Sequence, residues 1–195
     1  MHVADGILPV AGCVVAHFAS SAWLYSTCRD VQAAEASRMG LASAAAFVVS
    51  TIQFPIAGLP AHLGLYGLIG ILLGKRAFPV LYVCLLFQSL LLQNGGLLSL
   101  GVNSLNMGLG AFAGWWLWRL VPARAAIRAL LAGFVGALLP ALLLAWEFEL
   151  ADYGRGFYVV ASLYAVIAAV EAAVTTLAVS FLGRTKPDIL LPAPS

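Results

Sequence analysis

The first two residues, Met1 and His2, can bring three nitrogen donors to one point. The α-amine of Met1, the amide nitrogen of residue 2 and the imidazole of His2 form adjacent five- and six-membered chelate rings around a metal ion, once the amide has lost its proton. A fourth nitrogen would complete a square plane, the geometry that Ni(II) and Cu(II) prefer, and Co(II) also accepts nitrogen donors. The same two residues also fit a terminal histidine without a role, and this spacing alone does not decide between the two.

A second histidine, His62, is the candidate for the fourth corner. It lies in GLPAHLG, where proline and glycine are typical of a loop that enters a helix. The residues after Met-His, ADGILP, combine an Asp-Gly turn with a proline, so we expect the amino terminus to fold back towards the protein. The third histidine, His17, lies inside an apolar segment, which favours hydrogen-bonded packing over metal binding.

The composition indicates a membrane protein. Of 195 residues, 63% are hydrophobic and only 9% are charged, against roughly 25% charged residues in a soluble domain. The net charge of +2 does not indicate a nucleic-acid partner. The three cysteines have no CxxC spacing and are expected to be free thiols. No signal-peptide pattern is present, so we expect the first residues to be retained.

Hydrophobic segments of about 20 residues can cross a bilayer. The predicted fold is therefore an all-α integral membrane protein with about seven transmembrane helices. Residues 1–183 are expected to form a single polytopic transmembrane domain, and residues 184–195 a short cytoplasmic tail that is partly disordered. The seven segments are 9–27, 39–56, 60–74, 78–93, 101–120, 126–146 and 157–182.

The basic residues predict the orientation, because Lys and Arg collect in cytoplasmic loops. With the amino terminus outside and the carboxyl terminus in the cytoplasm, only Arg155 of the ten lies outside. The loop around His62 then shares the outer face with Met1 and His2. The cytoplasmic residues on this scheme are Arg29, Arg38, Lys75, Arg76, Arg119, Arg124, Arg128, Arg184 and Lys186.

Three stretches of residues 1–110 resemble one family. MHVADGILP, GLPAHLGLYGLIGILLGKRAFPVL and LLLQNGGLLSLGVNSLNMG are similar to the CbiM/NikM family, the substrate-binding components of cobalt and nickel energy-coupling factor (ECF) transporters. The resemblance implies that the metal is held by the terminal amine of Met1, the backbone nitrogen and side chain of His2, and His62. It also implies seven helices, with the amino terminus lodged in an outward-facing pocket.

The resemblance further implies what the chain carries and what it works with. Ni²⁺ or Co²⁺ is expected as transported substrate, for example to supply cobalamin synthesis or nickel enzymes, without a tightly bound organic cofactor. The expected partners are an EcfT/CbiQ-like coupling subunit, EcfA/CbiO-like ATPase subunits and a small CbiN/NikN-like accessory protein, in the plasma membrane of a prokaryote. The chain has no Walker A motif, so we expect a transporter subunit rather than an enzyme.

Other polar residues have two interpretations each. Asn103 and Asn106 lie three apart, hence on one helix face, and either hold His2 or His62 by hydrogen bonds or join helices to each other. Gln93 and Asn94 form either a lid over the pocket or a plain turn. Glu171, inside the last apolar segment, is a functional group, an interhelical partner or a protonated carboxyl.

Small residues in the second helix allow close approach of another helix. That helix belongs either to a partner subunit or to the same bundle, and the pattern fits both equally. The residues are Gly40, Ala42, Ala44 and Ala46.

A rival function is a redox protein with His17 and His62 as axial ligands of a haem. An intramembrane hydrolase is the third alternative, but no G-x-S-x-G motif supports it.

Overall fold

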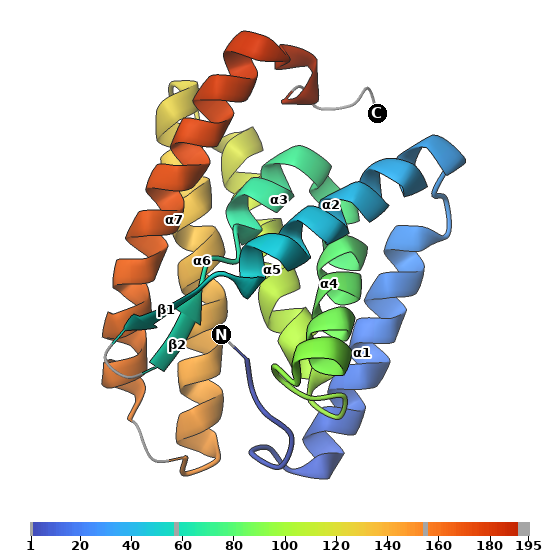
Figure 1. Cartoon of the computed structure of the whole chain (residues 1–195), viewed down its shortest axis with the longest axis vertical. Helices are drawn as coiled ribbons and strands as arrows, with labels where there is room; N and C mark the ends of the chain where they lie inside the picture. Colours follow the sequence, from blue (N-terminus) through green and yellow to red (C-terminus); the bar gives the residue numbers. More distant parts are fainter. Residues whose placement is uncertain (1, 57–58, 154–155, 191–195) are drawn as a thin grey trace.

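A computed structural model describes residues 2–56, 59–153 and 156–190. Within these residues the chain forms seven α-helices, two short 3₁₀ helices and one pair of β-strands (Figure 1). The helices are α1 (Val10–Cys28), α2 (Ala33–Thr51), α3 (Tyr66–Leu73), α4 (Ala77–Leu92), α5 (Leu100–Leu120), α6 (Ala125–Leu150) and α7 (Phe157–Thr185). The strands are β1 (Gln53–Ile56) and β2 (Leu59–His62), and the 3₁₀ helices are η1 (Gly74–Arg76) and η2 (Pro187–Ile189).

The helical fold expected from the hydrophobic segments is confirmed. In the described part of the chain, three stretches are long and apolar enough to cross a membrane by length and composition: Tyr66–Leu92, Ala125–Leu150 and Phe157–Thr185. The first contains α3, η1 and α4, and Gly74 turns the chain between them with a φ of +55°. The second helix starts earlier than expected, where Gln32 and Glu35 form a capping box.

One segment departs from the all-helical expectation. The segments predicted as 39–56 and 60–74 would make residues 53–56 and 60–65 helical, but α2 ends at Thr51 and α3 starts only at Tyr66. Between them β1 and β2 pair antiparallel, with Gln53 opposite His62 and Pro55 opposite Pro60. Proline lacks a backbone N–H and clashes with the preceding turn of a helix, so neither helix continues through this segment.

The short helix α3 packs inside the bundle through glycines. A Cβ atom built on Gly67 would lie 2.2 Å from the Ala132 carbonyl oxygen of α6, and one on Gly70 would lie 2.0 Å from the Ala111 carbonyl oxygen of α5. Glycine therefore lets the backbones of three helices approach closely, as is common in membrane bundles. This contact fixes the end of α3 that follows the hairpin.

The two ends of the bundle differ. At one end lie the amino-terminal segment, the hairpin and the loop between α4 and α5 (Figure 1). At the other end the Arg76 guanidinium forms ion pairs with Asp30 (2.8 Å) and Glu35 (2.9 Å) and donates to the Thr27 carbonyl oxygen. Lys75 pairs with Asp30 at 2.8 Å. These contacts tie the α1–α2 connection to the start of α4.

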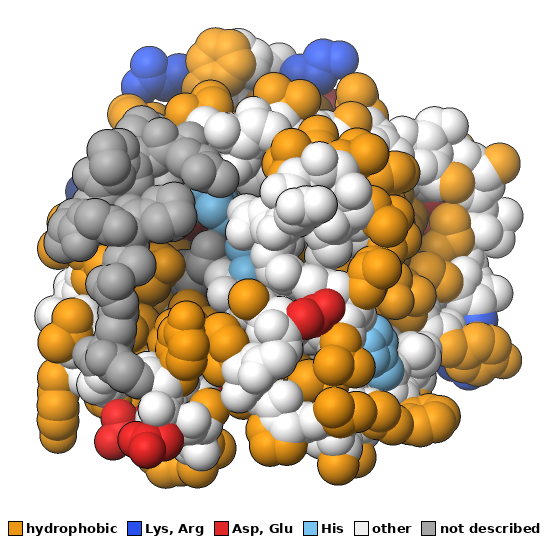
Figure 2. Space-filling view, turned by 60° about the horizontal axis from the view of Figure 1, so that its bottom comes forward, with side chains coloured by type: hydrophobic (Ala, Val, Ile, Leu, Met, Phe, Trp, Pro, Cys, Tyr) orange, Lys and Arg blue, Asp and Glu red, His pale blue; other side chains and the backbone are white. Residues whose placement is uncertain are grey.

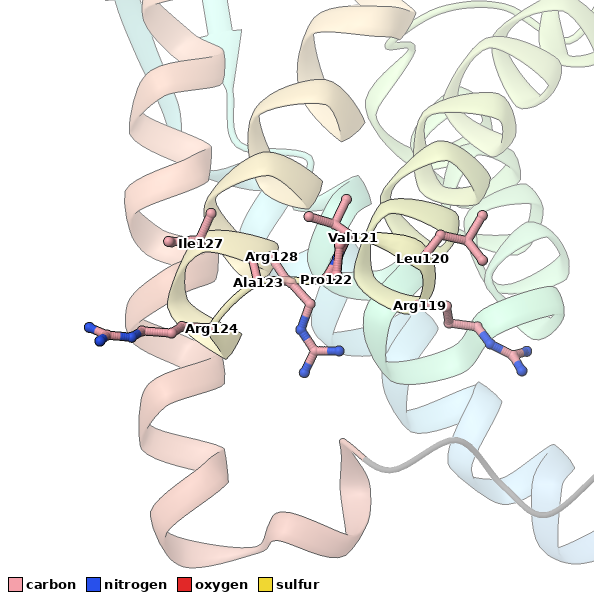
Figure 3. A pocket seen from close by; sticks show the side chains of 8 residues that line it. All are labelled: Arg119, Leu120, Val121, Pro122, Ala123, Arg124, Ile127 and Arg128. Carbon is pink, nitrogen blue, oxygen red and sulfur yellow. The ribbon is translucent and has the colours of Figure 1, made fainter.

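More arginines lie at this second end, around the turn between α5 and α6. Arg119, Arg124 and Arg128 border one open hollow there. Figure 3 shows the Arg119 and Arg124 side chains pointing in opposite directions. The Arg128 guanidinium lies 4.2 Å from the ring centre of Trp118 and donates to its carbonyl oxygen. The three guanidinium groups therefore do not converge on one ligand, and they fit the charged rim of a membrane protein.

The glycine packing of α3 makes a testable prediction. Gly70→Ala places a methyl group against the α5 backbone, and overpacking of this kind costs about 1–3 kcal/mol. We expect a lower thermal midpoint for the purified protein in detergent. Gly12→Ala is the matched control, because a Cβ atom at Gly12 meets no atom within 4 Å. Equal midpoints for both variants would contradict the close packing of α3.

Candidate metal site

Two histidines from distant parts of the sequence face each other. The Nε2 atoms of His2 and His62 lie 3.1 Å apart, and the rings stack with centres 5.1 Å apart and planes inclined by 21°. His62, at the end of β2, is only 3% exposed, and His2 is half-buried. Figure 2 shows histidine side chains, in pale blue, at the surface of this end of the molecule beside atoms drawn in white. The structure thus brings together two of the predicted ligands.

Both imidazoles are uncharged at neutral pH. Burial lowers the pKa of His2 well below its usual value and lowers the pKa of His62 to about 3. A neutral imidazole keeps a lone pair on one ring nitrogen, which is the form that binds a metal ion. At pH 7 neither side chain needs to lose a proton before it acts as a ligand.

Asn103 of α5 holds the backbone next to His2. The Val3 N–H donates to Asn103 Oδ1 (2.8 Å), and Asn103 Nδ2 donates to the Val3 carbonyl oxygen (2.9 Å). These two hydrogen bonds resemble those between paired β-strands. Together they hold both the N–H and the carbonyl group of Val3. The Val3 side chain is fully buried in the main hydrophobic cluster. Asn103 therefore acts on His2 through the neighbouring backbone rather than through its ring.

Asp5 provides a second attachment for the amino-terminal segment. The sequence pattern did not predict this role of Asp5. Its carboxylate accepts hydrogen bonds from the Ser99 N–H (2.8 Å), the Ser99 hydroxyl (2.5 Å) and the Leu98 N–H (3.2 Å). Desolvation acts to raise the pKa of Asp5, but these hydrogen bonds outweigh it and hold the pKa below the usual value. A Cβ atom on Gly96 would lie 2.0 Å from Asp5 Oδ1, so glycine is needed there.

The other side of the site is the turn that joins β2 to α3. His62 Nδ1 lies 3.3 Å from the Leu63 carbonyl oxygen. The next two N–H groups, of Gly64 and Leu65, donate to the two carboxylate oxygens of Glu171 in α7, at 2.6 and 2.9 Å. Glu171 is 1% exposed. The carboxylate that the sequence left with three interpretations is therefore bonded to the His62 turn.

Gln88 of α4 completes the buried wall and is a second residue that the sequence reading missed. Its amide nitrogen donates to Ser50 Oγ (2.8 Å) and approaches Cys84 Sγ at 3.2 Å, and its side chain interacts with the His2 ring. A cavity of about 10 Å³ lies between Gln88, His62 and Met107. That volume is at the lower limit for one water molecule, so the site is closely packed.

The remaining predicted residues lie elsewhere. His17 Nε2 is 3.0 Å from the carbonyl oxygens of both Leu97 and Leu98, which agrees with a packing role. Asn106 donates to both oxygens of Glu147. Met1, the first predicted ligand, lies outside the described residues.

The predicted lid and the small-residue face are also located. Gln93 adopts a φ of +52° and ends α4, and the Asn94 N–H donates to the Gln88 carbonyl oxygen, so both belong to a tight turn beside the site. On α2, Gly40 and Ala44 are exposed, whereas Ala42 and Ala46 pack against the core. Only half of the small-residue face is used inside the bundle.

The metal-binding side chains that the described residues bring together here are the two imidazoles. Among the described residues no group of three or more His, Cys, Asp or Glu side chains lies close enough to hold a metal ion. Two imidazoles alone do not fill the coordination shell of a transition metal. Any metal ion held between His2 and His62 therefore needs donors besides these two imidazoles.

Comparison with known proteins identifies the family. A family model described as "cobalt uptake substrate-specific transmembrane region" (CbiM) matches residues 2–189. The cobalt transport protein CbiM of Geobacter sulfurreducens is 33% identical over 215 residues, and the match covers 97% of this chain and 61% of that protein. The fused nickel transport protein NikMN of Rhodobacter capsulatus is 30% identical over 223 residues, covering 98% of this chain and 64% of that protein.

The fold agrees with the same assignment. A crystal structure of a transition metal transporter superposes with a TM-score of 0.83 at 27% sequence identity, covering 95% of this chain and 93% of the other. The class is therefore a membrane component of a metal transporter, and not an enzyme. The chain belongs to the CbiM family, and it spans less than two thirds of the length of the two relatives above.

The Asp5 contacts generate a prediction. Asp5→Ala removes all three hydrogen bonds to residues 98–99, and we expect amide hydrogen exchange in residues 3–8 to become about 10-fold faster or more. Because the folded pKa of Asp5 is depressed, its contribution is present above about pH 4 and is lost as pH falls through the folded value. Asp188→Ala, in η2, is the control and should change nothing in that segment. Unchanged protection in Asp5→Ala would exclude this anchoring role.

Proposed function

We propose that this chain is the substrate-binding subunit of an ECF-type ABC transporter that imports nickel or cobalt. The observation that carries the proposal is the His2–His62 pair, held by a docked amino-terminal segment. The names of the relatives, cobalt and nickel transport proteins, support the choice of metals. In this proposal the metal ion is the cargo, captured on one face of the membrane and released on the other.

The proposed ligands are the α-amine of Met1, the backbone nitrogen and imidazole of His2, and His62. The two rings already lie side by side, with their Nε2 atoms 3.1 Å apart. The six-membered chelate ring uses His2 Nδ1, which is buried and has no hydrogen-bond partner in the described structure. Rotation of the His2 ring would turn this nitrogen towards His62.

The hydrogen bonds also favour one protonation pattern. His62 Nδ1, facing the Leu63 carbonyl oxygen, carries the proton, so Nε2 of His62 is the acceptor towards His2. His2 then has its proton on Nε2 and its lone pair on Nδ1. This assignment follows from the hydrogen-bond partners, and it leaves the lone pairs on the two nitrogens that the proposed chelate uses.

We further propose that the amino-terminal end faces outwards and that η2 lies on the cytoplasmic side, in the plasma membrane of a prokaryote. The Arg76 cluster and Arg119, Arg124 and Arg128 all lie at the end opposite the site, which supports this orientation. A cysteine introduced at Ala123 should react with a membrane-impermeant reagent only after permeabilisation. Labelling of intact cells at that position would reverse the orientation.

Energy for import must come from other chains. We propose an EcfT/CbiQ-like coupling subunit and EcfA/CbiO-like ATPases, and the exposed Gly40 and Ala44 of α2 offer a face for close helix contact. The fused NikMN relative supports a NikN-like accessory protein.

A haem held by His17 and His62 is disfavoured, because His17 is hydrogen-bonded to the α4–α5 loop and His62 faces His2. Metal analysis of protein purified from cells supplied with both Ni²⁺ and Co²⁺ tests the cargo, and protein free of both would contradict it.

The ligand role of His62 is tested by substitution. His62→Ala removes one of four nitrogen donors, and we expect the affinity for Ni²⁺ to fall by at least about 100-fold, since one metal–ligand contact outweighs the 10- to 100-fold effect of an outer-shell partner. His17→Ala is the matched control and should bind Ni²⁺ as the wild type does. Isothermal titration with Ni²⁺ compares them, and equal affinities for His62→Ala and wild type would remove His62 from the site.

The role of the terminus is tested by insertion. One alanine placed between Met1 and His2 moves the amine away from the His2 chelate and forces extra atoms into a closely packed site. We expect Ni²⁺ and Co²⁺ binding and cellular uptake to be abolished, whereas a tag attached after Ser195 should leave both unchanged. Undiminished affinity in the protein with the inserted alanine would exclude the amine as a ligand.

A further inference from the structure

The proposed ligand set does not use Glu171, although this is the most deeply buried carboxylate beside the site. Its side chain, 1% exposed, extends from α7 into the bundle interior. Burial of a carboxylate is costly unless hydrogen bonds compensate it. Both oxygens have a partner, since the N–H groups of Gly64 and Leu65 donate to them at 2.6 and 2.9 Å. The two donors are consecutive residues of one turn, so the carboxylate fixes that turn from two points.

The turn would not hold its conformation through its own backbone. Leu65 has a φ of +51°, a left-handed conformation that a leucine rarely adopts. Gly64 lies under the ring of Tyr66, and a Cβ atom there would be 2.1 Å from Tyr66 Cζ. The turn is therefore strained at one residue and without spare room at the next. Such a conformation persists only where surrounding groups hold it, and Glu171 supplies two of those contacts.

The same turn determines how the His62 ring is presented. Leu63 lies between His62 and the two N–H groups that Glu171 holds, and its carbonyl oxygen is 3.3 Å from His62 Nδ1. A carbonyl that accepts from one ring nitrogen of a histidine fixes both the rotation of the ring and the tautomer, and so presents the other nitrogen as ligand. Displacement of residues 63–65 would therefore turn His62 Nε2 away from His2.

We propose that Glu171 is a positioning residue for the metal site: from α7 it locks the turn at residues 63–65, which orients the His62 imidazole for metal binding. This inference rests on the proposed function, because it needs His62 as a ligand. It differs from a purely structural role of Glu171 in one respect. The effect of Glu171 on metal affinity must act through His62 and must disappear when the His62 imidazole is absent.

A double-mutant cycle tests this dependence. Glu171→Gln keeps the size of the side chain but exchanges one acceptor oxygen for an NH₂ group that faces an N–H donor. Cu²⁺ is the probe, because it binds nitrogen sites more tightly than Ni²⁺ or Co²⁺, and residual binding by Met1 and His2 stays measurable. The affinity for Cu²⁺ is determined for wild type, Glu171→Gln, His62→Ala and the double variant. The ligand-field absorption band of bound Cu²⁺ is recorded for each.

The expected result is a loss of about 10- to 100-fold in Glu171→Gln, the range for residues that orient a metal ligand, with a shift of the absorption band towards that of His62→Ala. In the His62→Ala background, Glu171→Gln should cause no further loss. Additive losses, or an unshifted band, would overturn the positioning role. If His62→Ala loses affinity but Glu171→Gln does not, this inference alone fails. If His62→Ala binds as the wild type does, the proposed ligand set fails first.

Two further variants keep the test decisive. Glu171→Asp replaces Glu171→Gln in the test if Glu171→Gln fails to fold. Its carboxylate is one methylene too short to reach both N–H groups, so it should weaken Cu²⁺ binding through His62 in the same way. Glu147→Gln is the matched control, since it changes a carboxyl of α6 that is bonded to Asn106 and not to the His62 turn. Glu147→Gln should bind Cu²⁺ with the wild-type affinity. A loss equal to that of Glu171→Gln would show a general effect of removing a buried carboxylate and overturn the proposal.

Discussion

The structure depends on one constraint: non-helical backbone inside a membrane bundle must have its polar groups satisfied by the protein itself. Residues 52–56 and 59–65 interrupt the helices, and they are accommodated in two ways. β1 and β2 pair with each other, and the N–H groups after the hairpin donate to Glu171. The buried carboxyl group of Glu171 in α7 is therefore the counterpart of the interrupted backbone, and the interruption is what brings His62 into the interior.

The backbone polar groups of the amino-terminal segment must also be satisfied by the protein itself. The segment enters the bundle as extended chain. The side chain of Asn103 satisfies the polar groups of Val3, and the Asp5 carboxylate accepts hydrogen bonds from residues 98–99. Val3 adds a buried apolar anchor between these two attachments. His2 is thus held in place by its neighbours, and the ring itself stays available. The position of His2 is a property of backbone docking more than of side-chain packing.

Much of the fold was predictable because local patterns determine it. Hydrophobic length located the helices to within a few residues at most ends, and the prolines and glycines around His62 indicated a break there. The hairpin was not predictable, since Pro55 and Pro60 exclude a helix without specifying which strand they pair with. Glu171 was visible as an unusual residue and Asp5 only as part of a turn, and their partners lie 107 and 94 positions away in the sequence, farther than any spacing rule reaches. No sequence pattern indicated Gln88, because its role depends on the packing of α4 against the amino-terminal segment.

The Val3–Asn103 pair has a consequence for biosynthesis. The two residues are separated by 100 positions, so the amino terminus is made long before its binding partner on α5 exists. At a synthesis rate of roughly 5–20 residues per second, about 5–20 s pass before Asn103 has even been added to the chain. During that interval His2 has neither its anchor nor, until β2 is complete, its partner imidazole. A newly made chain therefore lacks the docked His2–His62 pair until both β2 and the start of α5 have been synthesised.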